Sequence, residues 1–144
     1  MTVVREFHQT FDLACPEAPP LFADPDEVRL RMRLIKEEYD EVFAELVSLL
    51  NAHTPEDVLD CYARLLKELA DLRYVVEGTA VSFALPIDEA YLAVHESNMS
   101  KVGDGGQPIR DVGGKVLKGP NYKSPAIYQF VPTIETITYQ EDLT

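Results

Sequence analysis

The fold is decided by the stretch LIKEEYDEVFAELVSLL at residues 34–50. Apolar residues recur in it at spacings of three and four, namely Leu34, Ile35, Val42, Leu46 and Leu49. This spacing places them on one stripe of an α-helix, which we expect to run from about residue 26 to 51. Glu38 falls in the same stripe, where a carboxylate is unfavourable unless something compensates its charge. The stretch therefore predicts a packed helix that carries acid on its apolar face.

Three further helices are predicted around this one. Thr54, followed by Pro55 and two acidic residues, is typical of a helix start. The helix that begins there should run to about Ser82, with one apolar stripe formed by Val58, Cys61, Leu65, Leu69, Leu72 and Val76. Pro86 opens another helix, which we expect to end near Gly103 as its C-terminal cap. A short helix over residues 3–12 can precede the prolines of the first 25 residues.

Glycine marks where the helical part ends, because six of the seven glycines fall between residues 103 and 119. We expect loop there, with a short hairpin turning at Gly113-Gly114. Residues 126–139 alternate enough to allow a strand, although Pro132 argues against it. The prediction is a single all-α domain over residues 1–144, with a helical body to about residue 102 and an irregular Gly-rich arm and tail over 103–144.

The net charge of −12 is confined to one part of the chain. Residues 1–96 hold 8 basic and 20 acidic residues, whereas residues 97–144 hold five of each. So acidic a body is unsuited to binding nucleic acid directly through its bulk charge. No apolar run approaches the ~20 residues that a bilayer requires, and the N-terminus lacks a signal peptide's apolar stretch. We expect a soluble, cytoplasmic protein whose two cysteines, Cys15 and Cys61, are free thiols.

Pairs of carboxylates recur on the two long helices. Glu38 and Glu41 lie three residues apart on the first helix, and Glu68 and Asp71 repeat that spacing on the second. Two antiparallel helices would bring these four together, and such a cluster suits a hard divalent cation such as Mg²⁺. No thiolate or imidazole accompanies them, which argues against zinc. The alternative is an ordinary solvated acidic helix face.

The helix after Pro86 carries a polar residue of its own among apolar ones. Asn98 shares a face with Tyr91 and Val94, and Lys101 lies at the edge of that face. A buried amide there needs a hydrogen-bond partner, for which the backbone is one candidate. The other reading places Asn98 and Lys101 in the same cleft as the carboxylates, where Lys101 would supply positive charge to phosphate oxygens.

Four motifs in fixed order resemble a known family: EEYDE at 37–41, KELADL at 67–72, HESNMSK at 95–101 and GGKVLKGPNYKSP at 113–125. Together they are similar to the MazG-like, all-α nucleoside triphosphate pyrophosphohydrolases, most of all to the short single-domain forms of phages and some bacteria. The resemblance covers about residues 5–125. It implies hydrolysis of a (d)NTP between the α and β phosphates to a nucleoside monophosphate and pyrophosphate.

The resemblance also implies roles for individual residues. Two or three Mg²⁺ or Mn²⁺ ions would be held by Glu38, Glu41, Glu68 and Asp71. Glu37 matches a position associated with a further ion or with activating the attacking water. Nucleotide-binding positions are matched by Asn98 and Lys101 for sugar and phosphates, by Lys118 and Tyr122 for closure over the nucleotide, and by Arg31 as a recurrent arginine.

Partners and substrate follow from the same resemblance. Short members of the family pair two chains to complete the helical bundle, so we expect a homodimer or homotetramer, in the host cytoplasm if the protein is phage-encoded. The first guess for the substrate is (d)GTP and the second is dUTP. Phe7 and His8 either stack on the base or pack between helices. The alternatives are phosphoribosyl-ATP pyrophosphohydrolase of histidine biosynthesis and a non-catalytic nucleotide- or metal-binding regulator.

Overall fold

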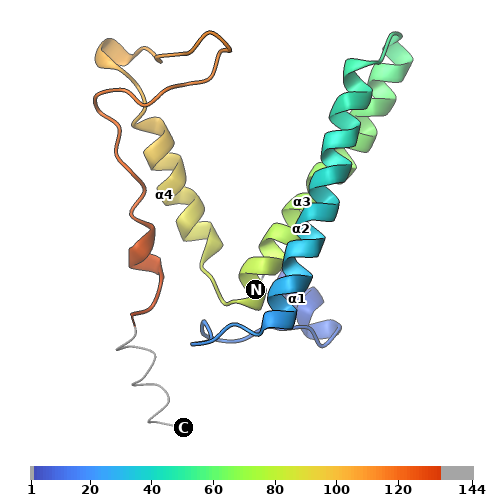
Figure 1. Cartoon of the computed structure of the whole chain (residues 1–144), viewed down its shortest axis with the longest axis vertical. Coiled ribbons are helices and arrows are strands. Elements are labelled where there is room, and N and C mark those ends of the chain that lie inside the picture. The colour runs from blue at the N-terminus through green and yellow to red at the C-terminus, as the bar shows by residue number, and fades with distance from the viewer. Residues whose placement is uncertain (1, 134–144) are drawn as a thin grey trace. The chain divides into compact units, whose positions relative to one another are not determined.

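The computed structural model describes residues 2–133, which form α-helices and short 3-10 helices with no β-strand among them (Figure 1). The all-α prediction is therefore confirmed. The chain divides into two compact units, Met1–Leu85 and Pro86–Thr144. Within residues 2–133, none of the helices carries an apolar stretch long enough to cross a bilayer. Both cysteines are free thiols, as expected.

The first unit is a helical hairpin with a short helix docked on it. Helices α2 (Pro25–Leu50) and α3 (Pro55–Ser82) lie side by side and antiparallel, and α1 (Val3–Thr10) packs against α3 (Figure 1). Thr54 begins α3 in a reciprocal capping box with Asp57. This pair satisfies backbone groups that a helix start would otherwise leave unpaired. Both long helices begin and end within one residue of the prediction.

Each long helix has two stripes, and only one of them faces its neighbour. The inner stripe of α2 includes the buried Val42 and the half-buried Glu38 and Glu45, and that of α3 includes the buried Cys61 and the half-buried Glu68. The predicted apolar stripes are wrong at Leu46, Leu69 and Val76, which are exposed. Each helix is rotated slightly about its axis, away from the orientation in which only apolar side chains would face the other helix. Carboxylates therefore take inner positions, and large apolar side chains face outward.

Helix α1 is fixed to α3 by a close approach of backbone to side chain. His8 is buried, and its Nδ1 lies 2.7 Å from the carbonyl oxygen of Ala14. A Cβ atom at Gly78 would lie 3.2 Å from His8 Nε2 and 3.3 Å from Arg31 Nη1. Glycine at this position therefore lets three helices meet. Phe7 contacts Phe11 and Tyr74 within the same unit, which favours the packing interpretation of Phe7 and His8.

The second unit begins with α4 (Ile87–Met99), which ends four residues before the predicted cap at Gly103. The chain is instead turned by serines: Ser97 Oγ donates to the Lys123 carbonyl oxygen at 2.7 Å, and the Lys123 N–H donates to Ser100 Oγ at 2.8 Å. Gly103 is buried and extended, and a Cβ there would lie 3.1 Å from the Gln107 carbonyl oxygen. Its lack of a side chain therefore serves the close packing of the loop and not a helix cap.

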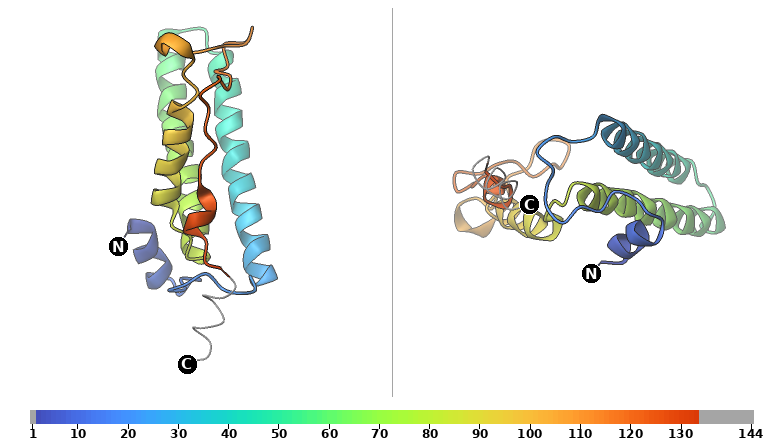
Figure 2. Two further views of the ribbon diagram at one scale, coloured as in Figure 1. Left: turned by 90° about the vertical axis from the view of Figure 1, so that its left-hand side faces the viewer. Right: turned by 90° about the horizontal axis from the view of Figure 1, so that it is seen from below.

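The rest of the second unit is irregular. A turn of 3-10 helix, η1 (Asp104–Gly106), precedes a tight turn at Gly113-Gly114. In this turn the Asp111 N–H donates to the Lys115 carbonyl oxygen at 3.0 Å, and Gly114 has a positive φ of 85°. The predicted hairpin is thus reduced to isolated bridges. The chain then returns alongside α4 to η2 (Ile127–Phe130), as both figures show (Figures 1 and 2). The strand allowed over 126–139 is wrong at 127–130, and residues 134–139 lie outside the described residues.

Candidate metal centre and nucleotide-binding residues

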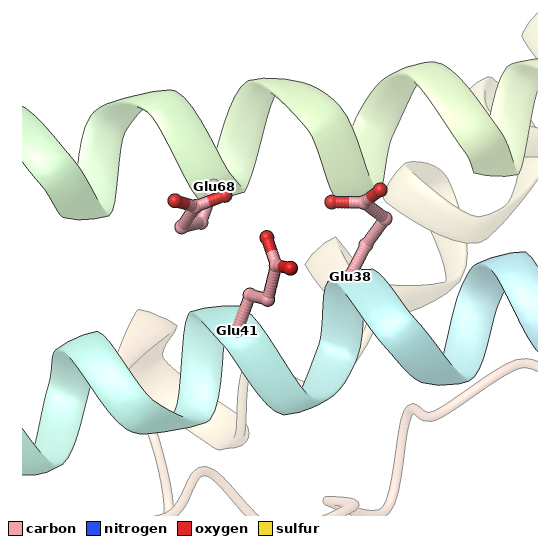
Figure 3. Close-up of side chains that lie close together, drawn as sticks. All are labelled: Glu38, Glu41 and Glu68. Atoms are coloured by element: carbon pink, nitrogen blue, oxygen red, sulfur yellow. The ribbon is translucent and has the colours of Figure 1, made fainter.

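Three carboxylates meet between the helices of the hairpin. Glu38 and Glu41 project from α2 toward α3, and Glu68 projects from α3 toward them (Figure 3). Each residue offers an oxygen that lies within 4.8 Å of the other two. The spacing of three residues puts Glu38 and Glu41 one turn apart on the same face. Of the four carboxylates predicted to cluster, the structure brings these three together, and Asp71 is not in the group.

One of the three carboxylates, that of Glu38, is not fully satisfied by its surroundings. Glu38 Oε2 is buried and has no hydrogen-bond partner, one of two such side-chain oxygens among residues 2–133, the other being Ser82 Oγ. Burial, the charge of Asp71 and that of Glu37 raise the pKa of Glu38. A hydrogen bond with Glu68, followed by burial, raises the pKa of Glu41. An acceptor left without a partner at this place indicates that something outside the chain completes it.

A lysine that the sequence analysis did not single out lies among these groups. Lys67 Nζ is 2.9 Å from Glu68 Oε2, 3.0 Å from Asp71 Oδ2 and 3.9 Å from Glu41 Oε2. Hydrogen bonds to Glu68 and Asp71 raise the pKa of Lys67, so the ammonium stays charged. The Lys67–Asp71 pair has the i,i+4 spacing at which helix ion pairs form, and that rule could have found it from the sequence.

The residues present fit a hard divalent cation. The donors are carboxylate oxygens alone, which suits Mg²⁺ or Mn²⁺, and one of them, Glu38 Oε2, lacks any partner within the chain. Asp71 lies beside the three carboxylates and is held by Lys67. Glu37 is exposed on α2, close enough for its charge to affect Glu38. The metal roles of all five acidic residues stay predictions.

Two of the predicted nucleotide-binding residues contact each other in the second unit. Lys118 Nζ lies 4.3 Å from the centre of the Tyr122 ring, in a cation–π geometry. Hydrogen bonds to Ser97 and Ser124, and one to Lys118, lower the pKa of the Tyr122 hydroxyl. Ser97 was not predicted, and the pair of serines at 97 and 100, three residues apart on one helix face, is the signal that could have found it. The KGPNY loop is thereby fixed to α4.

Asn98 and Lys101 lie at the end of α4. Asn98 is exposed, and its carbonyl oxygen accepts a hydrogen bond from the Lys101 N–H at 3.2 Å. The interpretation of Asn98 as a buried amide bonded to backbone is therefore wrong. Lys101 is half-buried, and its carbonyl oxygen lies 3.1 Å from the position of a Cβ at Gly119. Contacts of either residue with a sugar or a phosphate stay predictions.

Arg31 is placed in the interior of the hairpin. Its guanidinium Nε donates to Glu27 Oε1 at 2.6 Å, with side-chain exposures of 6% and 16%. A buried charge with a partner one helical turn away is satisfied within the fold. This placement accounts for Arg31 without a ligand, and its contact with a nucleotide stays a prediction.

Residues 4–98 match the family described as phosphoribosyl-ATP pyrophosphohydrolase, and the chain belongs to that family. The match includes both acidic helices and α4, and it agrees with the MazG-like resemblance. The protein is therefore a pyrophosphohydrolase of a nucleotide-like substrate. None of the curated proteins matches the chain.

Proposed function

We propose that the protein hydrolyses a free (d)NTP between its α and β phosphates, releasing a (d)NMP and pyrophosphate. The observation that carries this proposal is the meeting of Glu38, Glu41 and Glu68 within 4.8 Å, with one buried oxygen that no group of the chain satisfies. A triphosphate cannot approach such an acidic surface unless cations neutralise it. Two or three Mg²⁺ or Mn²⁺ ions would be held by these residues and Asp71.

The chain's own residues then have defined tasks. A bound divalent cation lowers the pKa of a coordinated water and offsets the negative charge of the phosphates. Glu37 would accept a proton of the attacking water as the water oxygen bonds to the α phosphorus, the bond from that phosphorus to the oxygen bridging the α and β phosphates breaks, and pyrophosphate leaves. The resemblance further assigns Lys101 and Lys118 to offsetting charge on the phosphates, Asn98 to the sugar, and Tyr122 to closure over the nucleotide.

A second substrate class is equally consistent with the family. Phosphoribosyl-ATP, the substrate in histidine biosynthesis, carries the same bond, and the matched family bears its name. The family match ends at residue 98, before Lys101 and the KGPNY loop. That loop is similar to those of the phage-type enzymes and supports a free nucleotide; (d)GTP as the first guess and dUTP as the second rest on the phage-like resemblance.

The deciding experiment is a panel of the eight (d)NTPs and phosphoribosyl-ATP, assayed for pyrophosphate release with Mg²⁺ and with Mn²⁺. We expect turnover of at least one (d)NTP. Turnover of phosphoribosyl-ATP alone would assign the protein to histidine biosynthesis. Tight binding of a nucleotide with no turnover would favour the non-catalytic regulator. Glu38→Gln is the matched control, since it removes one charge and retains the side-chain shape.

We further propose that two chains, or four, associate through the outer stripes of the hairpin. Large apolar side chains recur there at helical spacing and are exposed: on α2, Met32, Tyr39, Phe43, Leu46 and Leu50, and on α3, Leu59, Tyr62, Leu66, Leu69 and Val76. Exposed apolar side chains repeated along a helix face are typical of protein–protein contacts. Light scattering after size exclusion should give a multiple of 16.2 kDa, and a 16.2 kDa particle at micromolar concentration would contradict the proposal.

A further inference from the structure

We propose that the Lys67 ammonium is an internal counter-ion of the carboxylate cluster, which a divalent cation must displace in order to bind. This inference rests on the proposed metal site and assigns a role to a residue that takes no part in the proposed chemistry. Lys67 would thereby set the metal affinity of the protein and the stability of its metal-free form.

The contacts of Lys67 put it in direct competition with a metal ion. Its Nζ lies 2.9 Å from Glu68 Oε2 and 3.9 Å from Glu41 Oε2, and both residues belong to the group whose oxygens meet within 4.8 Å. It also lies 3.0 Å from Asp71 Oδ2. A carboxylate oxygen that accepts a hydrogen bond from the ammonium binds a metal ion more weakly, so the two compete for the same oxygens. Two like charges a few ångströms apart also repel each other.

Lys67 has room to leave. Its side chain is 63% exposed, whereas that of Glu68 is only 13% exposed. The carboxylate is thus held between the helices while the lysine approaches it from the solvent side on a flexible four-carbon stem. Displacement costs the ion pairs with Glu68 and Asp71 and requires no movement of the helices.

Lys36 provides a matched control on α2. Its Nζ pairs with Asp40 Oδ2 at 2.6 Å, and its side chain is 73% exposed. The pair has the same i,i+4 spacing as Lys67 and Asp71, and neither Lys36 nor Asp40 belongs to the cluster. Removing either lysine raises the net negative charge by one. Only removal of Lys67 takes a cation from the carboxylates themselves.

The test is to titrate the metal-free 144-residue chain with Mn²⁺ and to measure binding by calorimetry and by the EPR signal of free Mn²⁺. We expect Lys67→Ala to bind Mn²⁺ about three- to ten-fold more tightly than wild type, the range expected when several exposed ion pairs no longer compete. Lys36→Ala should change the affinity by less than about two-fold. Lys67→Arg keeps the positive charge and should stay near the wild-type affinity.

Thermal unfolding gives a second readout that needs no turnover. In EDTA, Lys67→Ala should unfold about 2–4 °C below wild type, because the carboxylates lose their counter-ion. Saturating Mn²⁺ should stabilise Lys67→Ala more than wild type. An unchanged or weaker Mn²⁺ affinity in Lys67→Ala would overturn the inference, as would wild type that binds no Mn²⁺. Failure of all nucleotides to turn over, with tighter Mn²⁺ binding intact, would instead contradict the proposed function alone.

Discussion

Two places on the same helical hairpin hold charge between α2 and α3, and they differ in how that charge is satisfied. At one, the Arg31 guanidinium is buried and Glu27 accepts its hydrogen bond at 2.6 Å. At the other, Glu38 has a buried oxygen without a hydrogen-bond partner, and burial and the charge of Asp71 raise its pKa although the charge of Lys67 acts in the opposite direction. The first is complete within the chain. The second should cost stability, as we expect of a group with the metal-binding role proposed for Glu38.

The two places differ in whether the charged group already has a partner within the hairpin. Both sites lie on regular helices, and both involve residues that the resemblance assigns to the nucleotide or its metal. They differ in what a substitution would leave behind: removing one partner of a buried ion pair leaves an uncompensated charge, whereas neutralising an unsatisfied carboxylate removes one. Neutralising Glu38 should therefore raise the stability of the metal-free protein, whereas neutralising the partner of Arg31 should lower it.

The largest effect is expected for Glu38→Gln. On the proposed metal site this substitution removes one carboxylate ligand of the cation, so pyrophosphate release should fall at least about 100-fold. The metal-free protein should instead unfold about 2–4 °C higher, since an uncompensated charge is removed. Turnover assays and calorimetry in EDTA measure the two changes.

Glu45 is the matched control for that substitution, because it occupies the same inner stripe with its partner Arg64 at 2.9 Å. Glu45→Gln should keep the activity and lower the stability of the metal-free protein. If Glu38→Gln and Glu45→Gln shifted the unfolding temperature in the same direction, the distinction between the two kinds of charge would fail.

Glu27→Gln should give the next largest effect. It leaves the buried Arg31 without a counter-charge, and we expect the free energy of unfolding to fall by about 2–3 kcal/mol. Urea denaturation monitored by circular dichroism measures this. Asp26→Asn is the control, since its pair with Arg29 is exposed, and it should cost under about 1 kcal/mol. Equal losses in the two variants would show that burial of the pair is unimportant.

Gly78→Ala probes the packing beside Arg31. The new Cβ would lie 3.2 Å from His8 Nε2, and His8 is held by the carbonyl oxygen of Ala14. Overpacking should outweigh the gain in helix propensity, for a net loss of about 1 kcal/mol. Gly113→Ala, where a Cβ meets only Asp111 Oδ1 at an ordinary 3.4 Å, should change stability by less than about 0.5 kcal/mol. In a His8→Ala background the penalty at Gly78 should shrink, and an undiminished penalty would contradict this account.

The smallest expected effect is a dependence of stability on pH. The fold raises the pKa of Glu38 above its ordinary value of 4.5, so the folded protein holds that proton to a higher pH than the unfolded chain. Stability from this group is therefore lost as the pH rises above about 4.5. The advantage of Glu38→Gln in EDTA should be present near pH 7 and vanish toward pH 4. An advantage independent of pH would mean that charge is not its cause.

Local signals in the sequence predicted most of the helices. Thr54 and Pro55 predicted the start of α3, because they act on backbone groups a few residues away, whereas Pro25, expected outside the helices, is the first residue of α2. The end of α4 was mispredicted since Ser97 and Ser100 bond to Lys123, more than twenty residues further along the chain. Glycine spacing alone cannot show which backbone groups a distant loop brings together.

The candidate site divides in the same way. The sequence alone determines that Glu38 and Glu41 share one helix face, because helical periodicity puts them there. The order of the acidic motifs along the chain also indicates the class of enzyme. Only the tertiary structure decided that Glu68 takes an inner position while Leu69 is exposed, that Lys67 lies among the carboxylates, and that Arg31 already has a partner in Glu27. Periodicity gives directions around a single helix, whereas burial and pairing depend on how far one helix is rotated against the next.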